Sequence, residues 1–325
     1  MKAVRIHDYS GPSAVRVDQA VVLEPGPGEV RIRVGAAGLN NSDLQTTYGA
    51  YRGYGHGGLP HILGQEAAGE VDAVGPGVTR FRLGMRVVGH VSGALAEMAI
   101  GPATELLRLP DQVSFEVAAS LPIAYLTASL ALVHKAKLQL GEWVLVHPGS
   151  GGVGAAAIQL AKLLGGRVIA TTSDAAKRAR LLELGAEHGL NYSTQDVSSE
   201  VRRITGDAGV QVALDGGGKV TFPDCLAAIA SNGRIVSYGL TTGMDAALPL
   251  RKLIGRNVTL YGIALWYNSD YQGALATLTN LVLPVVAEGK LQPAIDQVVD
   301  LDGVADALVR MEKRRLMGKI VVVPT

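Results

Sequence analysis

Four glycines stand within the seven residues 148–154, directly after the apolar run Trp143–His147. The spacing G-x-G-x-x-G is matched by Gly149, Gly151 and Gly154. Val153–Leu164 follows with helical periodicity and strong helix formers. A strand, a glycine turn and a helix in this order predict a site for a dinucleotide pyrophosphate, because glycines let the backbone approach phosphate and a helix N-terminus offers free N–H groups. The alternative is a turn without a ligand, and a P-loop is excluded because no Gly-Lys-Ser/Thr follows.

The residues after the next predicted strand, Arg167–Thr172, indicate which dinucleotide binds. A site for NAD places Asp or Glu at the end of this strand, where it holds the ribose 2′-hydroxyl. Here Ser173 stands at that end and Asp174 lies beyond it, with Lys177 and Arg178 on the following turn. A hydroxyl with nearby cations suits a 2′-phosphate, so we expect NADPH. The alternative is that the cations are ordinary solvated charges of a basic helix, which fits Arg178 better than Lys177.

The composition limits the classes of protein and partner. A chain of 325 residues with 48% hydrophobic residues is long enough for about two domains with real cores. A net charge of +1 and a charged fraction of 18% indicate neither nucleic acid nor a membrane surface as partner. The single cysteine, Cys225, excludes an internal disulfide and a zinc site with two or more thiolates, and it suits a reducing cytoplasm.

Two different patterns of elements follow one another along the chain. The first part, roughly 120 residues, has alternating or β-branched runs separated by Pro and Gly turns, which predict an antiparallel barrel-like domain. These runs are Lys2–Ile6, Ala14–Val22, Glu29–Ala37, Pro60–Gly75 and Arg86–Ile100. From Phe115 onward, helical segments alternate with short β runs, which predict a doubly wound parallel sheet. A final predicted strand, Lys319–Val323, is placed to return to the first domain, with the ligand cleft expected between the domains.

Five motifs are spread over the whole chain. They are Gly38-Leu39-Asn40-x-x-Asp43, Gly64-x-Glu66-x-x-Gly69, Pro122-x-x-Tyr125-x-Thr127-Ala128, the turn His147–Gly154, and Gly318-Lys319-Ile320. Through them the chain resembles the medium-chain dehydrogenase/reductase superfamily, and within it the zinc-free quinone oxidoreductases of the zeta-crystallin type. The resemblance implies an α/β chain of two domains. Residues 1–122, completed by 267–325, would form a GroES-like β-barrel catalytic domain, and residues 123–266 a Rossmann NADP-binding domain.

Zinc-dependent alcohol dehydrogenases of the same superfamily differ from this chain at their metal site. They carry Cys where this chain has Asn40 and His where it has Gln65, and they have a lobe with four cysteines. Amide side chains are poor zinc ligands, so the resemblance implies that no metal is bound. The favoured reaction is then hydride transfer from NADPH to an electron-poor acceptor, a quinone or an activated enone. The alternatives are reduction of enoyl thioesters or alkenals on the same fold, and NADPH binding without turnover.

The resemblance also implies which residues contact the cofactor. The pyrophosphate would be held by Ser150, Gly151, Gly152 and Val153. The 2′-phosphate would be held by Ser173 and Lys177, and the adenosine by Tyr192. Thr127 and Gly239 would lie near the nicotinamide. Arg314 would reach back to the cofactor, with Arg315 as a competitor for this role.

Asn40, Tyr51 and Gln65 are the residues that the resemblance assigns to the acceptor. Tyr51 would donate a hydrogen bond to a carbonyl oxygen as charge develops there, and Gln65 would order its surroundings. The alternatives are a wall aromatic for Tyr51 and a turn residue for Asn40. The family often has a second tyrosine where this chain has Gln45. A homodimer is expected through the last Rossmann strand, Val258–Ile263, because an apolar edge strand would otherwise be exposed.

Overall fold

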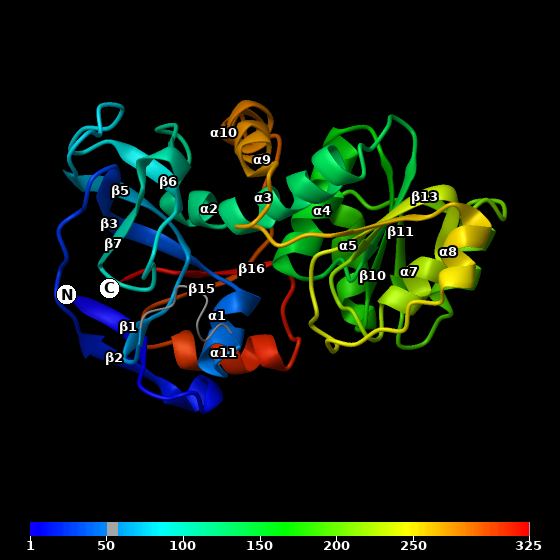
Figure 1. The fold of residues 1–325 in the computed structure, drawn as a ribbon, viewed down its shortest axis with the longest axis horizontal. Coiled ribbons are helices and arrows are strands. Elements are labelled where there is room, and N and C mark those ends of the chain that lie inside the picture. The colour runs from blue at the N-terminus through cyan, green and yellow to red at the C-terminus, as the bar shows by residue number, and fades with distance from the viewer. Residues whose placement is uncertain (51–57, 325) are drawn as a thin grey trace. The chain divides into compact units, whose positions relative to one another are not determined.

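The computed structural model describes residues 1–50 and 58–324 (Figure 1). Its contacts divide the chain into two compact units. The first unit comprises Met1–Ile123 and Val285–Thr325, and the second comprises Ala124–Pro284. No helix in the described ranges has both the length and the apolar character that a membrane crossing requires.

The first unit is built from two β-sheets. The smaller sheet has the order β2-β1-β4 and the larger has the order β15-β16-β3-β5-β6-β8, with β7 paired to β3. All pairs are antiparallel except β15 with β16. The strands are β1 (Lys2–Ile6), β2 (Val15–Gln19), β3 (Glu29–Leu39), β4 (His61–Ile62), β5 (Glu66–Val74), β6 (Arg86–His90), β7 (Met98–Pro102), β8 (Leu106–Arg108), β15 (Ile295–Val299) and β16 (Lys319–Val322).

Strand β3 shows why these residues form a half-buried sheet. Val30, Ile32 and Val34 are buried and alternate with charged residues that are more exposed, as an alternating pattern requires. The strand β16 pairs with the end of β3, so the last predicted strand does return to the first unit's sheet. The helices that accompany these sheets in the described residues include α1 (Asn41–Thr47), α2 (Phe115–Ala119) and α11 (Val304–Glu312).

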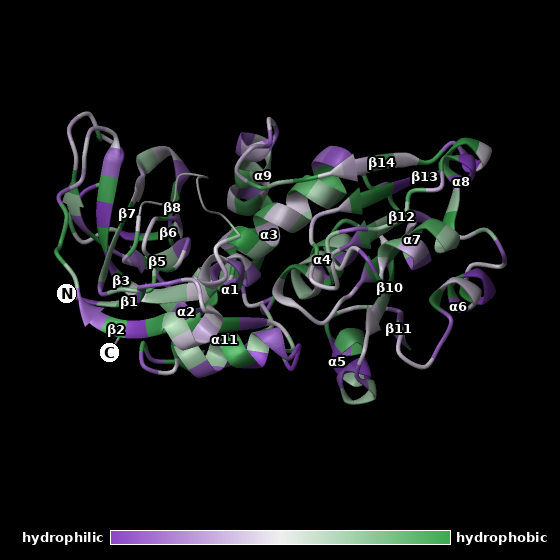
Figure 2. Cartoon of the chain, turned by 60° about the horizontal axis from the view of Figure 1, so that its bottom comes forward, coloured by the Kyte–Doolittle hydropathy of each residue, from purple (hydrophilic) through white to green (hydrophobic). Residues whose placement is uncertain are grey.

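The second unit contains a six-stranded parallel sheet of order β11-β10-β9-β12-β13-β14. This confirms the predicted doubly wound sheet, whose strand order reverses between β9 and β12. The strands are β9 (Trp143–His147), β10 (Arg167–Thr172), β11 (His188–Asn191), β12 (Val210–Asp215), β13 (Ile229–Ser237) and β14 (Thr259–Gly262). Helices surround them in Figures 1 and 2, namely α4 (Gly152–Leu163), α5 (Arg178–Glu183), α6 (Val197–Ile204), α7 (Phe222–Ala228) and α8 (Leu250–Arg256).

The helix α3 (Pro122–Ser129) begins at the end of the first unit and continues as a π-helical turn, Leu130–Lys135. Its apolar residues are green in Figure 2, and residues 124–128 are buried. Burial of these residues makes α3 a core helix.

The division of the chain differs from the predicted one for residues 267–284, which the contacts group with the second unit. This segment forms α9 (Tyr271–Thr277), a π-helical turn and the beginning of α10 (Leu283–Ala287), whose last residues belong to the first unit. Lys135 Nζ lies 2.8 Å from the carboxylate of Asp270, and Gly273 packs against the ring of His134. Helix α6 lies between two predicted β runs, and only three apolar residues mark its inner face within a polar sequence.

Candidate cofactor and acceptor sites

The residues predicted to contact the cofactor gather at one edge of the parallel sheet. Ser150 follows β9, Ser173 follows β10, and Tyr192 follows β11. Gly239 stands two residues after β13. Because parallel strands end at the same edge, the second unit brings these four residues to the side where nucleotides bind in such folds.

The glycine turn has the shape that an anion site needs. Gly151 is the N-cap of α4, with extended backbone angles and no side-chain cap. A Cβ on Gly154 would lie 2.4 Å from the carbonyl oxygen of Pro148, so the helix packs directly on the turn. A Cβ on Gly151 would meet nothing within 4 Å, so the space beside the helix start is open. The first N–H groups of α4 therefore remain available to a phosphate.

His147 supports this turn from inside the sheet, a role that the sequence did not reveal. Its side chain is fully buried, and Nδ1 lies 2.5 Å from Oγ1 of Thr171. The carbonyl oxygen of Thr171 accepts the N–H of Gly149 at 2.7 Å. The ring of Tyr192 meets the His147 ring edge-on at 5.1 Å. A polar residue at the end of an otherwise apolar strand was the available signal.

The structure separates the two cations that follow β10. Arg178 donates from Nε to the carbonyl oxygen of Gly189 at 2.7 Å, so its guanidinium has a structural partner. Asp174 accepts the N–H of Ala176 at 2.9 Å and thereby caps the short turn that ends at Lys177. Ser173 is exposed and Lys177 is half-buried. The backbone contact thus gives Arg178 a structural role, and the assignment of Lys177 to a 2′-phosphate stays a prediction.

A buried carboxylate orders the loops around Gly239, and the sequence interpretation missed it. Asp215 is fully buried at the end of β12 and accepts four hydrogen bonds. The donors are Gly217 N at 3.2 Å, Gly218 N at 3.0 Å, Thr221 Oγ1 at 2.5 Å and Ser237 Oγ at 2.9 Å. A Cβ on Gly239 would lie 2.5 Å from the carbonyl oxygen of Gly216, so the two loops touch. An acidic residue between an apolar strand and three glycines was the signal.

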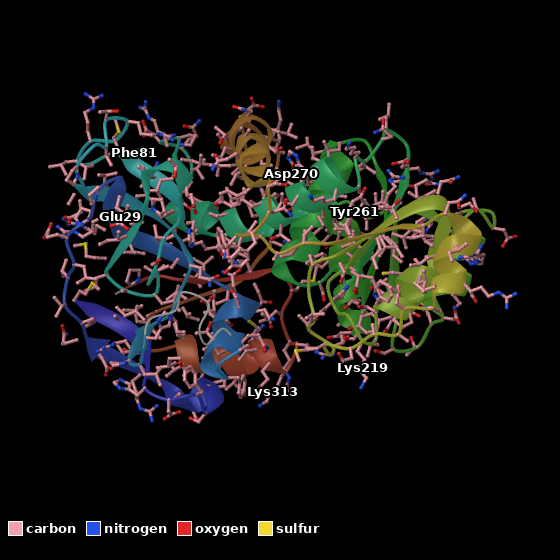
Figure 3. The ribbon with its side chains drawn as sticks, in the orientation of Figure 1. Glu29, Phe81, Lys219, Tyr261, Asp270 and Lys313 are labelled. Carbon is pink, nitrogen blue, oxygen red and sulfur yellow. The ribbon has the colours of Figure 1, made fainter. Side chains whose placement is uncertain are left out.

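Thr127 and Arg314 are the remaining cofactor predictions. Thr127 lies on α3 with 8% of its surface exposed. Arg314 and Arg315 are exposed just beyond α11, next to Lys313, which is labelled in Figure 3. Contact of these residues with the cofactor stays a prediction.

Asn40 belongs to a buried polar cluster in the first unit, together with Glu66 and Lys319. Nδ2 of Asn40 donates to Oε1 of Glu66 at 2.7 Å. The ammonium of Lys319 contacts both Oδ1 of Asn40 and Oε1 of Glu66. Glu66 is fully buried and Lys319 is 5% exposed. Oε2 of Glu66 accepts the N–H of Ile123 at 2.7 Å, so both carboxylate oxygens have partners.

Asp43 adds a second buried carboxyl group beside this cluster. It accepts the N–H of Asn40 at 2.8 Å and that of Gly64 at 3.1 Å. Burial raises the pKa of Asp43 to about 7, while its backbone hydrogen bonds and the nearby Lys319 oppose the rise. Asp43 therefore titrates close to neutral pH. Its carboxyl group also holds the backbone N–H of Asn40, the residue that precedes α1.

The other two acceptor predictions have different outcomes. Gln65 is half-buried, and its Oε1 accepts from Oγ of Ser42 at 3.1 Å. This hydrogen bond is consistent with the predicted role of Gln65 in ordering its surroundings. Tyr51 lies outside the described residues. Gln45, which replaces the family's second tyrosine, is half-buried on α1.

Two family models match the chain: an alcohol dehydrogenase GroES-like domain over residues 26–111 and a zinc-binding dehydrogenase over residues 152–280. A quinone oxidoreductase from Pseudomonas aeruginosa is 33% identical, with 99% of each chain covered. A 2-haloacrylate reductase from a Burkholderia species is 32% identical, covering 99% of this chain and 98% of the relative. The structure of Escherichia coli quinone oxidoreductase complexed with NADPH matches with a TM-score of 0.92 and 28% identity over 100% of both chains.

The chain belongs to the quinone oxidoreductase-like family of the medium-chain dehydrogenase/reductase superfamily. It is therefore an oxidoreductase that uses a nicotinamide cofactor. Membership confirms the fold class predicted from the motifs, a GroES-like unit with a Rossmann unit.

The family model that matches residues 152–280 is a zinc-binding dehydrogenase. Whether this chain could bind zinc depends on its donor atoms at the positions of the metal ligands. Asn40 and Gln65 offer only amide oxygens, which bind zinc poorly. The oxygen of Asn40 and one oxygen of Glu66 already contact the ammonium of Lys319, which would repel a second cation. Across residues 1–50 and 58–324, three or more His, Cys, Asp or Glu side chains nowhere gather as a metal site. These residues do not fit zinc.

Proposed function

We propose that this protein is an NADPH-dependent reductase that transfers hydride to a quinone or an activated enone without a metal. The observation that carries the proposal is the cluster of Asn40, Glu66 and Lys319. It sets the amide of Asn40, which stands where zinc-dependent relatives carry a cysteine, against the ammonium of Lys319. A reductase built this way needs an acceptor that is already electron-poor, because no Lewis acid polarises it. The quinone oxidoreductase relatives support this choice.

The preference for NADPH over NADH rests on the end of β10. Ser173 replaces the acidic residue that would hold a ribose 2′-hydroxyl and repel a 2′-phosphate. Lys177 stands on the following turn, while Arg178 is engaged with Gly189. The NADPH complex of the Escherichia coli relative supports the same preference.

The residues of this chain would act mainly by position. The N–H groups at the start of α4 and the turn at Ser150–Val153 bind the pyrophosphate, with Tyr192 beside the adenosine. The loops ordered by Asp215 set the position of Gly239 beside the nicotinamide. When bound, NADPH supplies a hydride, and the acceptor takes up this hydride together with one proton. Tyr51 would donate a hydrogen bond to the acceptor oxygen as charge develops there.

Reduction of an α,β-unsaturated carboxylic acid of the haloacrylate kind is the second candidate function. The 32% identical relative named 2-haloacrylate reductase favours it over an enoyl thioester as substrate. The same hydride and proton would then be added across a carbon–carbon double bond next to a carbonyl group.

Turnover assays would test these proposals directly. Purified protein with NADPH is mixed with a series of quinones, enones and enoyl thioesters, and loss of absorbance of the reduced cofactor is followed. Quinones or enones are expected to oxidise NADPH. Tight NADPH binding without turnover on any acceptor would contradict an enzymatic function. About one zinc per chain in purified protein would contradict the metal-free assignment.

We also propose a homodimer through β14. This strand forms one edge of the parallel sheet, and Leu260 on it is 36% exposed. Tyr261, labelled in Figure 3, lies on the same strand. On the neighbouring helix α8, Leu250 and Ile254 are 62% and 75% exposed. An apolar edge of this kind needs a cover, and a second copy of the chain would provide it. Sedimentation as a monomer would contradict the dimer.

The proposed location is the cytoplasm. Cys225 is a buried, free thiol, and burial raises its pKa well above the ordinary value. A buried thiol of this kind suits a reducing compartment, where it stays unreactive. A fluorescent fusion that accumulates in an oxidising compartment would contradict this location.

A further inference from the structure

We propose that Lys319 is a positioning residue that fixes the side-chain amide of Asn40 in one orientation for the acceptor. The inference rests on the proposed function, since Asn40 is assigned there to the acceptor. Nothing in the sequence motif pairs these two residues, which are separated by 279 positions. They are brought together because β16 pairs with the end of β3, with Ile320 opposite Leu39.

The contacts of the amide allow only one of its two orientations. Oδ1 of Asn40 faces the ammonium of Lys319, and Nδ2 faces Oε1 of Glu66 at 2.7 Å. A flipped amide would turn its NH2 group toward the ammonium and its oxygen toward the carboxylate. Both contacts would then be repulsive in a buried, poorly screened place. Lys319 and Glu66 together therefore decide which way Asn40 points.

The same contacts define what Asn40 offers to an acceptor. Nδ2 donates to Oε1 of Glu66 and also to the carbonyl oxygen of Gly38 at 3.3 Å. Both N–H groups of the amide thus have partners within the protein. Asn40 would therefore contact the acceptor with a side-chain amide of fixed orientation. Loss of the Lys319 ammonium would allow this amide to rotate.

Lys319 also compensates the negative charge of Glu66, which accepts from the amide of Asn40. Glu66 is fully buried, and its second oxygen is held by the N–H of Ile123 at 2.7 Å. Without the ammonium, this carboxylate would be buried with neutral donors alone. A methionine at position 319 has similar length but no charge, so it removes both the contact to Asn40 and the compensation of Glu66.

Kinetics of a set of variants with NADPH and the best quinone would test the inference. Lys319→Met is expected to lower kcat/KM for the quinone about tenfold, with NADPH affinity changed less than about twofold. Lys319→Arg keeps a cation and should restore most of the loss. Lys319→Met added to Asn40→Ala should change kcat/KM less than about twofold, because Lys319 acts through Asn40. Lys290→Met, which removes an exposed ammonium paired with Glu288, is the matched control.

The double variant Lys319→Met/Glu66→Gln removes both buried charges and serves if Lys319→Met alone fails to fold. It should fold and show the same loss for the quinone, with NADPH affinity again preserved. Additive losses for Lys319→Met and Asn40→Ala would overturn the inference, as would wild-type kinetics of Lys319→Met. A wild-type protein that binds NADPH but reduces no acceptor would instead contradict the proposed function itself.

Discussion

Each unit holds a fully buried carboxylate beside the residues assigned to function, and the two are stabilised differently. Asp215 in the second unit accepts from backbone N–H groups and hydroxyls, all of them neutral. Glu66 in the first unit is paired with the ammonium of Lys319. Neutral donors fix backbone loops, whereas a buried ion pair makes its surroundings depend on charge. We therefore expect the residues assigned to the cofactor to respond most to added side-chain volume. The residues assigned to the acceptor should respond most to changes of charge and pH.

The largest expected effect is on the pH dependence of stability in the first unit. The pKa of Asp43 is about 7 in the folded protein and near 3.8 in the unfolded chain. Between these values only the folded state keeps this proton. The stability that it contributes is fully present below pH 3.8, decreases as pH rises, and levels off above pH 7. The whole change is about 4 kcal/mol.

Denaturant unfolding of wild type and Asp43→Asn between pH 5 and 8 would measure this effect. Asp43→Asn removes the titration, so its stability should fall less with rising pH than that of the wild type. The exposed carboxylate variant Asp111→Asn is the control and should keep the wild-type profile. Parallel profiles for wild type and Asp43→Asn would show that Asp43 does not titrate in this range.

The next largest effect is expected from added side-chain volume in the glycine turn at residues 148–154. Gly154→Ala places a Cβ 2.4 Å from the backbone oxygen of Pro148, which cannot move away as a side chain would. We expect NADPH affinity to fall about 100-fold, with a lower melting temperature. Gly255→Ala is the control, because a Cβ there meets nothing within 4 Å and the residue lies in the exposed helix α8. Equal affinities for the two variants would contradict the proposed packing of α4 on its turn.

These two regions also differ in how far the sequence predicts them. The cofactor turn lies in one stretch, where strand, glycines and helix follow each other within about 20 residues. Local patterns therefore predicted its elements, and the structure has the strands Trp143–His147 and Arg167–Thr172 with the predicted bounds. The sequence favoured Lys177 over Arg178 for the phosphate, but the contact of Arg178 with the carbonyl oxygen of Gly189 depends on the fold.

The acceptor cluster combines segments far apart in the chain. Asn40 was proposed from a motif, but its partners Glu66 and Lys319 stand 26 and 279 residues away. Their meeting depends on the register of β16 against β3, which no periodicity specifies. Asp43 was likewise part of a motif, but its raised pKa follows from burial that only the fold determines. The role of Tyr51, outside the described residues, stays a prediction.

The next effect in size concerns the charge of Lys177, which is proposed to distinguish NADPH from NADH. Lys177→Ala should weaken NADPH binding about 30-fold and NADH binding less than about twofold, because only NADPH carries the 2′-phosphate. Arg178→Ala is the matched control on the neighbouring residue. It should leave the ratio of the two affinities unchanged, since its guanidinium binds a backbone oxygen. Equal losses for NADPH and NADH in Lys177→Ala would remove Lys177 from the phosphate site.

The smallest effect separates the two buried carboxylates most directly. Ser237→Ala removes one of the four neutral donors to Asp215 and leaves the other three in place. The free energy of unfolding should fall by about 1.5 kcal/mol and NADPH affinity by about threefold, as expected for one hydrogen bond to a charged group. The loss should be the same at pH 6 and pH 8, because a hydroxyl does not titrate there. A loss that changes with pH would contradict the role of the Ser237 hydroxyl as one of several neutral donors to Asp215.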